Sequence, residues 1–360
     1  MENTLTVPKR IPQLQFLRFL AFLLVFLQHS SAWNVLSPPS IIGQGGMSFF
    51  FFLSGFGTGY SAPGKTTAPT PKNILLHMWR KLKKFYPLYF AAMFFGIIKS
   101  WLPYDIAELQ LAAVGKELFQ FLKNTLLIQA WFMDGYMTYN GVGWFLSVMM
   151  FLYLFNVPGT WLLNRIYEKK NRKIILSGLF VSILALTWIY DALFWETDPL
   201  YWISIFPPSR IGEYLLGMII GFAVNHLFST GYPTKLNPML FTFLEILSFV
   251  IYVFVAKLPP KVWHVPVVAW LIPNTLMLSV FALGKGFISK VFSNRFLAYL
   301  GDISSECYLI HQLIITVFAT SFDVSHVSLA GDLFALFFCF VSTLLLAHLL
   351  HGGKLPKKEK

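Results

Sequence analysis

Two polar residues that could carry chemistry, Arg18 and His29, stand eleven positions apart in the apolar stretch 14–31. At about 100° per residue they share one helix face, and at ~1.5 Å per residue they are roughly 16 Å apart. Histidine accepts and returns a proton near neutral pH, as acyl or proton transfer requires. The alternative is an arginine that extends to the membrane interface and a histidine at a helix end. We favour function, because charges within spans usually face protein or water.

A basic run at 78–90 contains Arg80, Lys81, Lys83 and Lys84. Such a cluster can hold phosphate groups through charge-assisted hydrogen bonds. Basic clusters beside a span also set its orientation or contact anionic lipids, and that interpretation stays open.

Charged residues also occur inside later apolar segments. Arg210 and Glu213 are three positions apart and can pair on one helix, which lowers the cost of placing both near a membrane. Asp302, Glu306 and His311 share a further segment that is too polar for a span facing only lipid. We therefore expect these charged side chains to face polar surroundings inside the protein.

The elements that must position these residues follow from composition. The 360 residues are 56% hydrophobic and 12% charged, with a mean hydropathy of +0.62. These values indicate an integral membrane protein of the all-α class and exclude a soluble domain. The net charge of +12 lies in short clusters between apolar runs, which argues against nucleic-acid binding. Cys307 and Cys339 lie in apolar segments, and we expect neither a disulfide nor a metal site.

About ten transmembrane helices are predicted, because ten apolar stretches are long enough to cross a ~30 Å hydrocarbon layer. Their limits are 14–31, 41–60, 86–102, 142–163, 174–195, 209–228, 239–257, 265–283, 296–320 and 329–351. Within the stretch 41–60, Ser54 and Gly55 interrupt an aromatic run, and such small residues let helices approach closely.

Orientation follows from the basic residues. With a cytoplasmic N-terminus, 21 of the 28 Lys and Arg fall in inner segments and five in outer segments, which places both termini inside. Arg18 then lies towards the cytoplasm and His29 towards the outer face. Residues 1–351 are predicted to form one transmembrane domain and 352–360 a basic cytoplasmic tail. The long outer segment 103–141 is a candidate lid.

Taken together, these stretches resemble the acyltransferase 3 family of bacterial membrane acyltransferases over nearly the whole chain. The most specific match is RFLAFLLVFLQH, with the family's pattern of Arg, ten residues and His. Supporting matches are FFFLSGF at 50–56, the basic run that ends in Tyr-Pro at 80–87, RIGEYLLG at 210–217 and LGDISSECYLIH at 300–311. One departure is Met149, where many members carry a glutamate.

The resemblance implies acyl-CoA as donor and transfer of an acyl group, often acetyl, to an extracytoplasmic carbohydrate. It makes His29 the catalytic histidine, Arg18 its functional partner and Arg80 the leading contact for the donor's phosphates. Lys83 and Lys84 occupy the family's second basic position, where they lack the bidentate geometry of arginine.

The resulting hypothesis is an O-acyltransferase, with acetyl the favoured group, in the bacterial plasma membrane. Acetyl-CoA acts as co-substrate with no tightly bound cofactor, and a surface or exported polysaccharide or its lipid-linked precursor is the acceptor. The alternative is a transporter or flippase for a polysaccharide precursor or small anion. Predicted donor contacts are Arg80, Lys83, Lys84 and Tyr86, and predicted substrate contacts are Ser54, Trp144, Arg210, Glu213, Tyr308 and His311.

Overall fold

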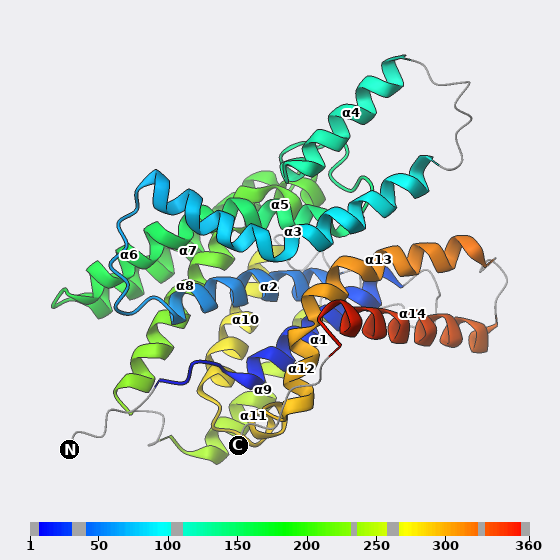
Figure 1. Ribbon diagram of the computed structural model, residues 1–360. Helices are drawn as coiled ribbons and strands as arrows, with labels where there is room; N and C mark the ends of the chain where they lie inside the picture. Colours follow the sequence, from blue (N-terminus) through cyan, green and yellow to red (C-terminus); the bar gives the residue numbers. More distant parts are fainter. Residues whose placement is uncertain are drawn as a thin grey trace.

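The computed structural model describes residues 7–30, 41–101, 111–231, 236–257, 266–322 and 328–353, and all regular structure in these ranges is helical. This confirms the all-α prediction for the described residues. Residues 354–360 of the predicted tail and 103–110 of the candidate lid lie outside them. Figure 1 shows α1 (Pro12–His29), α2 (Ile41–Tyr60), α3 (Pro71–Trp101), α4 (Leu111–Thr125), α5 (Trp144–Leu152), α6 (Asn156–Tyr167), α7 (Arg172–Phe194), α8 (Ile211–Ser229), α9 (Pro238–Lys257), α10 (Pro266–Leu283), α11 (Phe287–Phe292), α12 (Arg295–Asp302), α13 (Ser304–Ser321) and α14 (Leu329–Leu350).

Each predicted span overlaps one helix or two joined helices. Within the described residues, five helical stretches are long and apolar enough to cross a membrane, and α12 with α13 make a sixth if these helices, bent by 58°, form one span. The five are Gly141–Tyr167, Arg172–Phe194, Pro207–Ser229, Pro238–Lys257 and Leu329–Leu350. The other helices that overlap predicted spans are shorter or more polar than these stretches. The number of about ten crossings therefore stays a prediction.

The central helices differ from the outer ones in what they contact. α2 packs along both α1 and α8 at the centre of the bundle (Figure 1). In the stretch that contains α8, 61% of the residues are buried, against 17% in α7 and 22% in α14. A central helix can carry polar residues because these face protein rather than lipid. The polar residues that could take part in chemistry therefore concentrate on the central helices.

The contact between α2 and α8 is built on four glycines, which we call the glycine seam: Gly55 and Gly59 on α2, and Gly217 and Gly221 on α8. A Cβ atom at Gly55 would lie 2.0 Å from the backbone oxygen of Tyr214 on α8. A Cβ atom at Gly217 would lie 2.1 Å from a backbone oxygen of α2. The backbones thus touch, as the small residues of α2 predicted.

Two carboxylates inside the outer helices are structural. The carboxylate of Glu245 on α9 accepts hydrogen bonds from the backbone N–H groups of Ile288, at 2.9 Å, and Ser289, at 3.3 Å, at the start of α11. Asp191 on α7 accepts one from the N–H of Val268 on α10 at 3.2 Å. Both carboxylates thereby satisfy helix N-termini that would otherwise leave buried donors unpaired.

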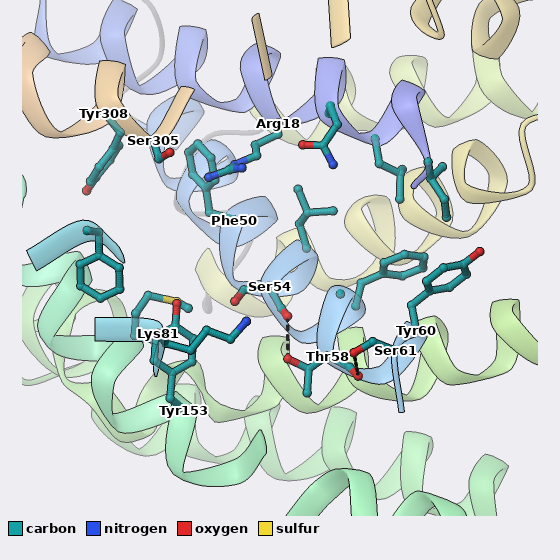
Figure 2. A pocket seen from close by; sticks show the side chains of 18 of the residues that line it. Arg18, Phe50, Ser54, Thr58, Tyr60, Ser61, Lys81, Tyr153, Ser305 and Tyr308 are labelled. Carbon is teal, nitrogen blue, oxygen red and sulfur yellow. Dashed lines mark hydrogen bonds between the residues drawn. The ribbon is translucent and has the colours of Figure 1, made fainter. Parts of the chain in front are cut away.

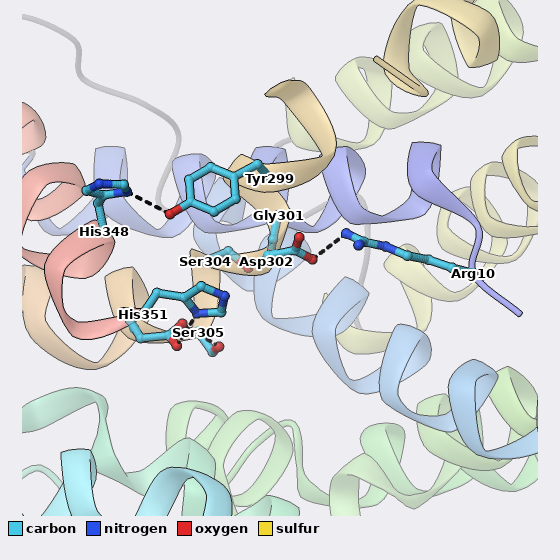
Figure 3. A network of polar contacts seen from close by, with 9 residues as sticks. Arg10, Tyr299, Gly301, Asp302, Ser304, Ser305, His348 and His351 are labelled. Carbon is cyan, nitrogen blue, oxygen red and sulfur yellow. Dashed lines mark hydrogen bonds and ion pairs between the residues drawn. The ribbon is translucent and has the colours of Figure 1, made fainter. Parts of the chain in front are cut away.

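A polar network surrounds the bend between α12 and α13 (Figure 3). Arg10, which precedes α1, pairs with Asp302 at 2.5 Å, and His351, which follows α14, contacts Glu306 at 2.8 Å. A Cβ atom at Gly301 would lie 1.9 Å from a backbone oxygen of α1, so α12 lies directly against α1. The start of α1 and the end of α14 therefore lie at the same end of the bundle. That this end is cytoplasmic stays a prediction.

Candidate active site

The last residue of α1, His29, is paired with a second histidine, His311 on α13. His29 Nδ1 lies 2.8 Å from His311 Nε2, and the two rings stack with centroids 5.0 Å apart. His311 Nδ1 lies 2.8 Å from the backbone oxygen of Tyr308, one helical turn earlier. Phe22 and Phe26 on α1 pack against the His311 ring at centroid distances of 5.5 and 6.2 Å. These contacts hold both imidazoles in one arrangement.

Further contacts hold α13 at this position. The side-chain amide of Asn140 donates to the backbone oxygen of Leu309 at 2.9 Å. The hydroxyl of Tyr308 donates to the backbone oxygen of Val142 at 3.2 Å. Both contacts come from the short segment before α5, so the approach of this segment fixes the helix that carries His311.

A cavity of about 480 Å³ opens at the other end of α1. Its walls come from the start of α1, from α2, α3 and α5, and from the first turns of α13. Four basic side chains line it: Lys9, Arg10, Arg18 and Lys81. Figure 2 shows Arg18 and Lys81 entering from opposite sides, with Ser54 of α2 between them. The cavity is therefore suited to an anionic ligand.

Two of these cations, Arg18 and Lys81, are half-buried and have no ion-pair partner within the described residues, whereas Lys9 is exposed. Arg10 is engaged by Asp302, whereas the Arg18 guanidinium makes no hydrogen bond or ion pair with the part of the chain that the structure describes. The Lys81 ammonium lies 5.8 Å from the ring centre of Tyr153. Burial lowers the pKa of Lys81, and the charges of Lys84 and Lys65 lower it further. An anion in the cavity would relieve this repulsion.

The residues predicted to bind the donor lie elsewhere on α3. Arg80, Lys83 and Lys84 are exposed and are not among the residues that line the cavity. The hydroxyl of Tyr86 donates to the backbone oxygen of Thr125 at 2.8 Å and so ties α3 to the end of α4. The cation that does line the cavity is Lys81, a member of the same basic run.

The position of Lys81 follows from helix geometry. Phe85 and Tyr89 follow Lys81 at intervals of four residues, and this stripe faces the bundle, where Tyr89 is almost fully buried. Arg80 stands nine residues before Tyr89, which places it on the opposite face at about 100° per residue. The aromatic spacing within α3 could therefore have identified Lys81.

The predicted substrate contacts divide into three groups. Ser54 and Tyr308 line the cavity. Arg210 and Glu213 form the predicted ion pair at 3.0 Å, fully buried, and Arg210 Nε also donates to the backbone oxygen of Ser204 at 2.8 Å. Two others do not line the cavity: Trp144 packs against Phe145, and His311 pairs with His29.

An aromatic layer, which we define as Phe50, Phe145 and Tyr308, reaches from the cavity to the histidine pair through Tyr308. All three side chains line the cavity and contact one another at centroid distances of 5.0 to 5.9 Å. The ring of Tyr308 also lies 5.7 Å from that of His311. Tyr308 therefore connects the lining of the cavity to the histidine pair. Among the described residues, no group of His, Cys, Asp and Glu converges to hold a metal ion.

Comparison with known proteins identifies the family. The acyltransferase 3 family model, described as an acyltransferase domain, matches residues 11–352. No curated protein and no solved structure matches the chain. The matched region contains the histidine pair, Arg18, Lys81 and the aromatic layer. The chain therefore belongs to the acyltransferase 3 family and is, in general terms, a membrane acyltransferase.

Proposed function

We propose that the protein transfers an acyl group, with acetyl favoured, from cytoplasmic acyl-CoA to a hydroxyl group of a polysaccharide. The acceptor is a surface or exported polysaccharide, or its lipid-linked precursor, at the bacterial plasma membrane. One observation carries this proposal: a cation-lined cavity and a histidine pair lie at opposite ends of a single helix. Arg18 and His29 are roughly 16 Å apart along its axis.

The donor's phosphates are assigned to the cavity. Lys81 and Arg18 are its half-buried cations without an ion-pair partner within the described residues, and both can form charge-assisted hydrogen bonds with phosphate oxygens. Three exposed basic residues lie on the same part of α3 as Lys81, namely Arg80, Lys83 and Lys84. Their positive charge attracts the donor. This places the phosphate contact one residue after the arginine that the sequence favoured.

The chemistry is assigned to His29. As a general base, its imidazole takes the proton of the acceptor hydroxyl while the hydroxyl oxygen bonds to the thioester carbon. The carbon–sulfur bond breaks, and the sulfur receives the proton. As a nucleophile, the imidazole bonds to the thioester carbon first, and the carbon–sulfur bond breaks to release the coenzyme A thiolate. The acceptor hydroxyl then bonds to the acyl carbon, displaces the imidazole and gives its proton to the thiolate. Both routes need one unprotonated ring nitrogen.

The test compares polysaccharide from a strain that lacks the protein with that from the same strain after complementation. NMR should show O-acetyl esters lost in the first and restored in the second. Membrane vesicles supplied with acetyl-CoA labelled in the acetyl group should incorporate the label into base-labile esters only when the protein is present. Unchanged ester content together with no incorporation would contradict the proposal.

A further inference from the structure

We propose that His311 is a positioning residue that fixes the tautomer of His29 and leaves His29 Nε2 unprotonated and free to react. This inference rests on the proposed function, because it names how the catalytic histidine is prepared. It replaces the sequence-based role of His311 as a substrate contact.

The hydrogen-bond chain determines where the protons lie. The backbone oxygen of Tyr308 can only accept a hydrogen bond, so the proton between it and His311, 2.8 Å apart, belongs to His311 Nδ1. A neutral imidazole carries one proton, which leaves His311 Nε2 as an acceptor. The 2.8 Å contact with His29 then requires the proton on His29 Nδ1. Within the described residues, only His29 Nε2 keeps a lone pair that no hydrogen bond uses.

Neutrality of His311 follows from its surroundings. The residue is fully buried, and its ring packs against Phe22, Phe26 and Tyr308. Within the described residues no carboxylate makes a hydrogen bond or ion pair with either histidine. A permanent imidazolium would therefore be a buried charge without a partner, which is costly.

The same contacts argue against substrate binding by His311. Both of its ring nitrogens are engaged, one by Tyr308 and the other by His29. A contact with the acceptor would break one of these bonds in a buried place. His29 is different, because it ends α1, is only partly buried and has one ring nitrogen without a partner in the part of the chain that the structure describes.

The arrangement also supports the charge that develops during the reaction. When the acceptor hydroxyl gives its proton to His29 Nε2, His29 becomes an imidazolium, and its Nδ1–H still donates to His311 Nε2. A hydrogen bond from a charged donor is stronger than one from a neutral donor. The oxygen bonds to the thioester carbon, the carbon–sulfur bond breaks, and the proton passes from His29 to the departing sulfur. His311 keeps its own proton throughout.

Two near-isosteric variants test this role. Glutamine places its amide near the position of Nε2, where its oxygen can accept from His29, whereas asparagine reaches only the position of Nδ1 and can donate to Tyr308. We expect His311→Asn to lower kcat on the order of 100-fold with KM for acetyl-CoA unchanged, and His311→Gln to stay within about tenfold of wild type. Equal losses in both variants, or a raised KM at constant kcat, would overturn the proposal.

A second measurement does not depend on activity. In purified wild-type protein with ¹⁵N-labelled histidine, the His29 signal, assigned by its loss in His29→Gln, should show a protonated Nδ1 and an unprotonated Nε2. His311→Asn should shift this signal towards a mixture of tautomers. A wild-type His29 protonated at Nε2 would overturn the tautomer assignment even if acyl transfer is confirmed. The expected tautomer in a protein that transfers no acyl group would instead contradict the proposed function alone.

Discussion

The two ends of α1 differ in how they satisfy their polar residues. At the Arg18 end, several basic side chains line a cavity. The Arg18 guanidinium and the Lys81 ammonium have no carboxylate partner within the described residues. At the His29 end, both ring nitrogens of His311 have hydrogen-bond partners, and the ring is buried against apolar side chains. Cations without a partner are suited to binding an anionic ligand, whereas a chain of hydrogen bonds is suited to holding one proton in place.

The largest effect is expected for a variant that removes acyl transfer but keeps donor binding. His29→Ala removes the only proposed proton acceptor, so acyl transfer should fall on the order of 100-fold or more while donor binding at the other end of α1 stays near normal. O-acetyl content by NMR and acetyl-CoA binding by calorimetry measure the two quantities.

A matched control is His226→Ala, since His226 is a half-buried histidine on α8 that contacts neither end of α1. Wild-type O-acylation by the His29→Ala protein would eliminate the catalytic role and favour transport of a polysaccharide precursor.

The second prediction determines which end faces the cytoplasm. The cavity-lining Ser61 begins the segment that leads to Thr70, which is exposed. In a protein without its two buried cysteines, a cysteine at Thr70 should resist an impermeant reagent applied outside. A cysteine at position 260, which lies outside the described residues, should react. The reverse pattern would place the cavity on the outer face and contradict a cytoplasmic donor.

The third prediction compares two neighbouring cations. Lys81→Ala should weaken acetyl-CoA binding about tenfold at low salt, because a charge-assisted contact inside the cavity is lost. Arg80→Ala is the matched control on the exposed face of the same helix, and it should weaken binding less. Raising salt should erase the Arg80 effect first, since exposed charges are screened more strongly. A larger loss from Arg80→Ala would restore the sequence-based assignment.

The smallest effect is expected in the aromatic layer. Tyr308→Phe keeps the ring but removes the hydrogen bond to the backbone oxygen of Val142. One neutral hydrogen bond contributes about 1 kcal/mol, so the free energy of unfolding should fall by about this amount. Donor binding and transfer should both stay near wild type. A loss of transfer as large as that of His29→Ala would show that the hydroxyl takes part in the reaction.

Sequence patterns predicted the individual elements better than their contacts. Arg18 and His29 were placed on one face from their spacing, and Arg210 and Glu213 were expected to pair, because helix periodicity fixes such local relations. The His29–His311 contact joins residues 282 positions apart, which no local period reveals. It depends on how α13 packs against α1.

Composition also misjudged the roles of two charged residues. Glu245 was counted only as part of an apolar stretch, yet it caps α11 from a neighbouring helix. Lys81 was grouped with three exposed basic residues, although the aromatic stripe through Phe85 and Tyr89 places it in the cavity. In both cases the role depends on the direction of the side chain, which composition does not contain.

The glycine seam has a consequence for the size of the acyl group. Because the backbones of α2 and α8 already touch at Gly55 and Gly217, α2 cannot shift towards α8 to widen the bundle. In the proposed reaction, we therefore expect passage from the cavity to His29 to depend on rotation of rings such as Phe50, which α2 carries. The length of acyl chain that turns over is then limited by the volume that those rings free, so replacing Phe50 with a smaller residue should extend the range towards longer chains.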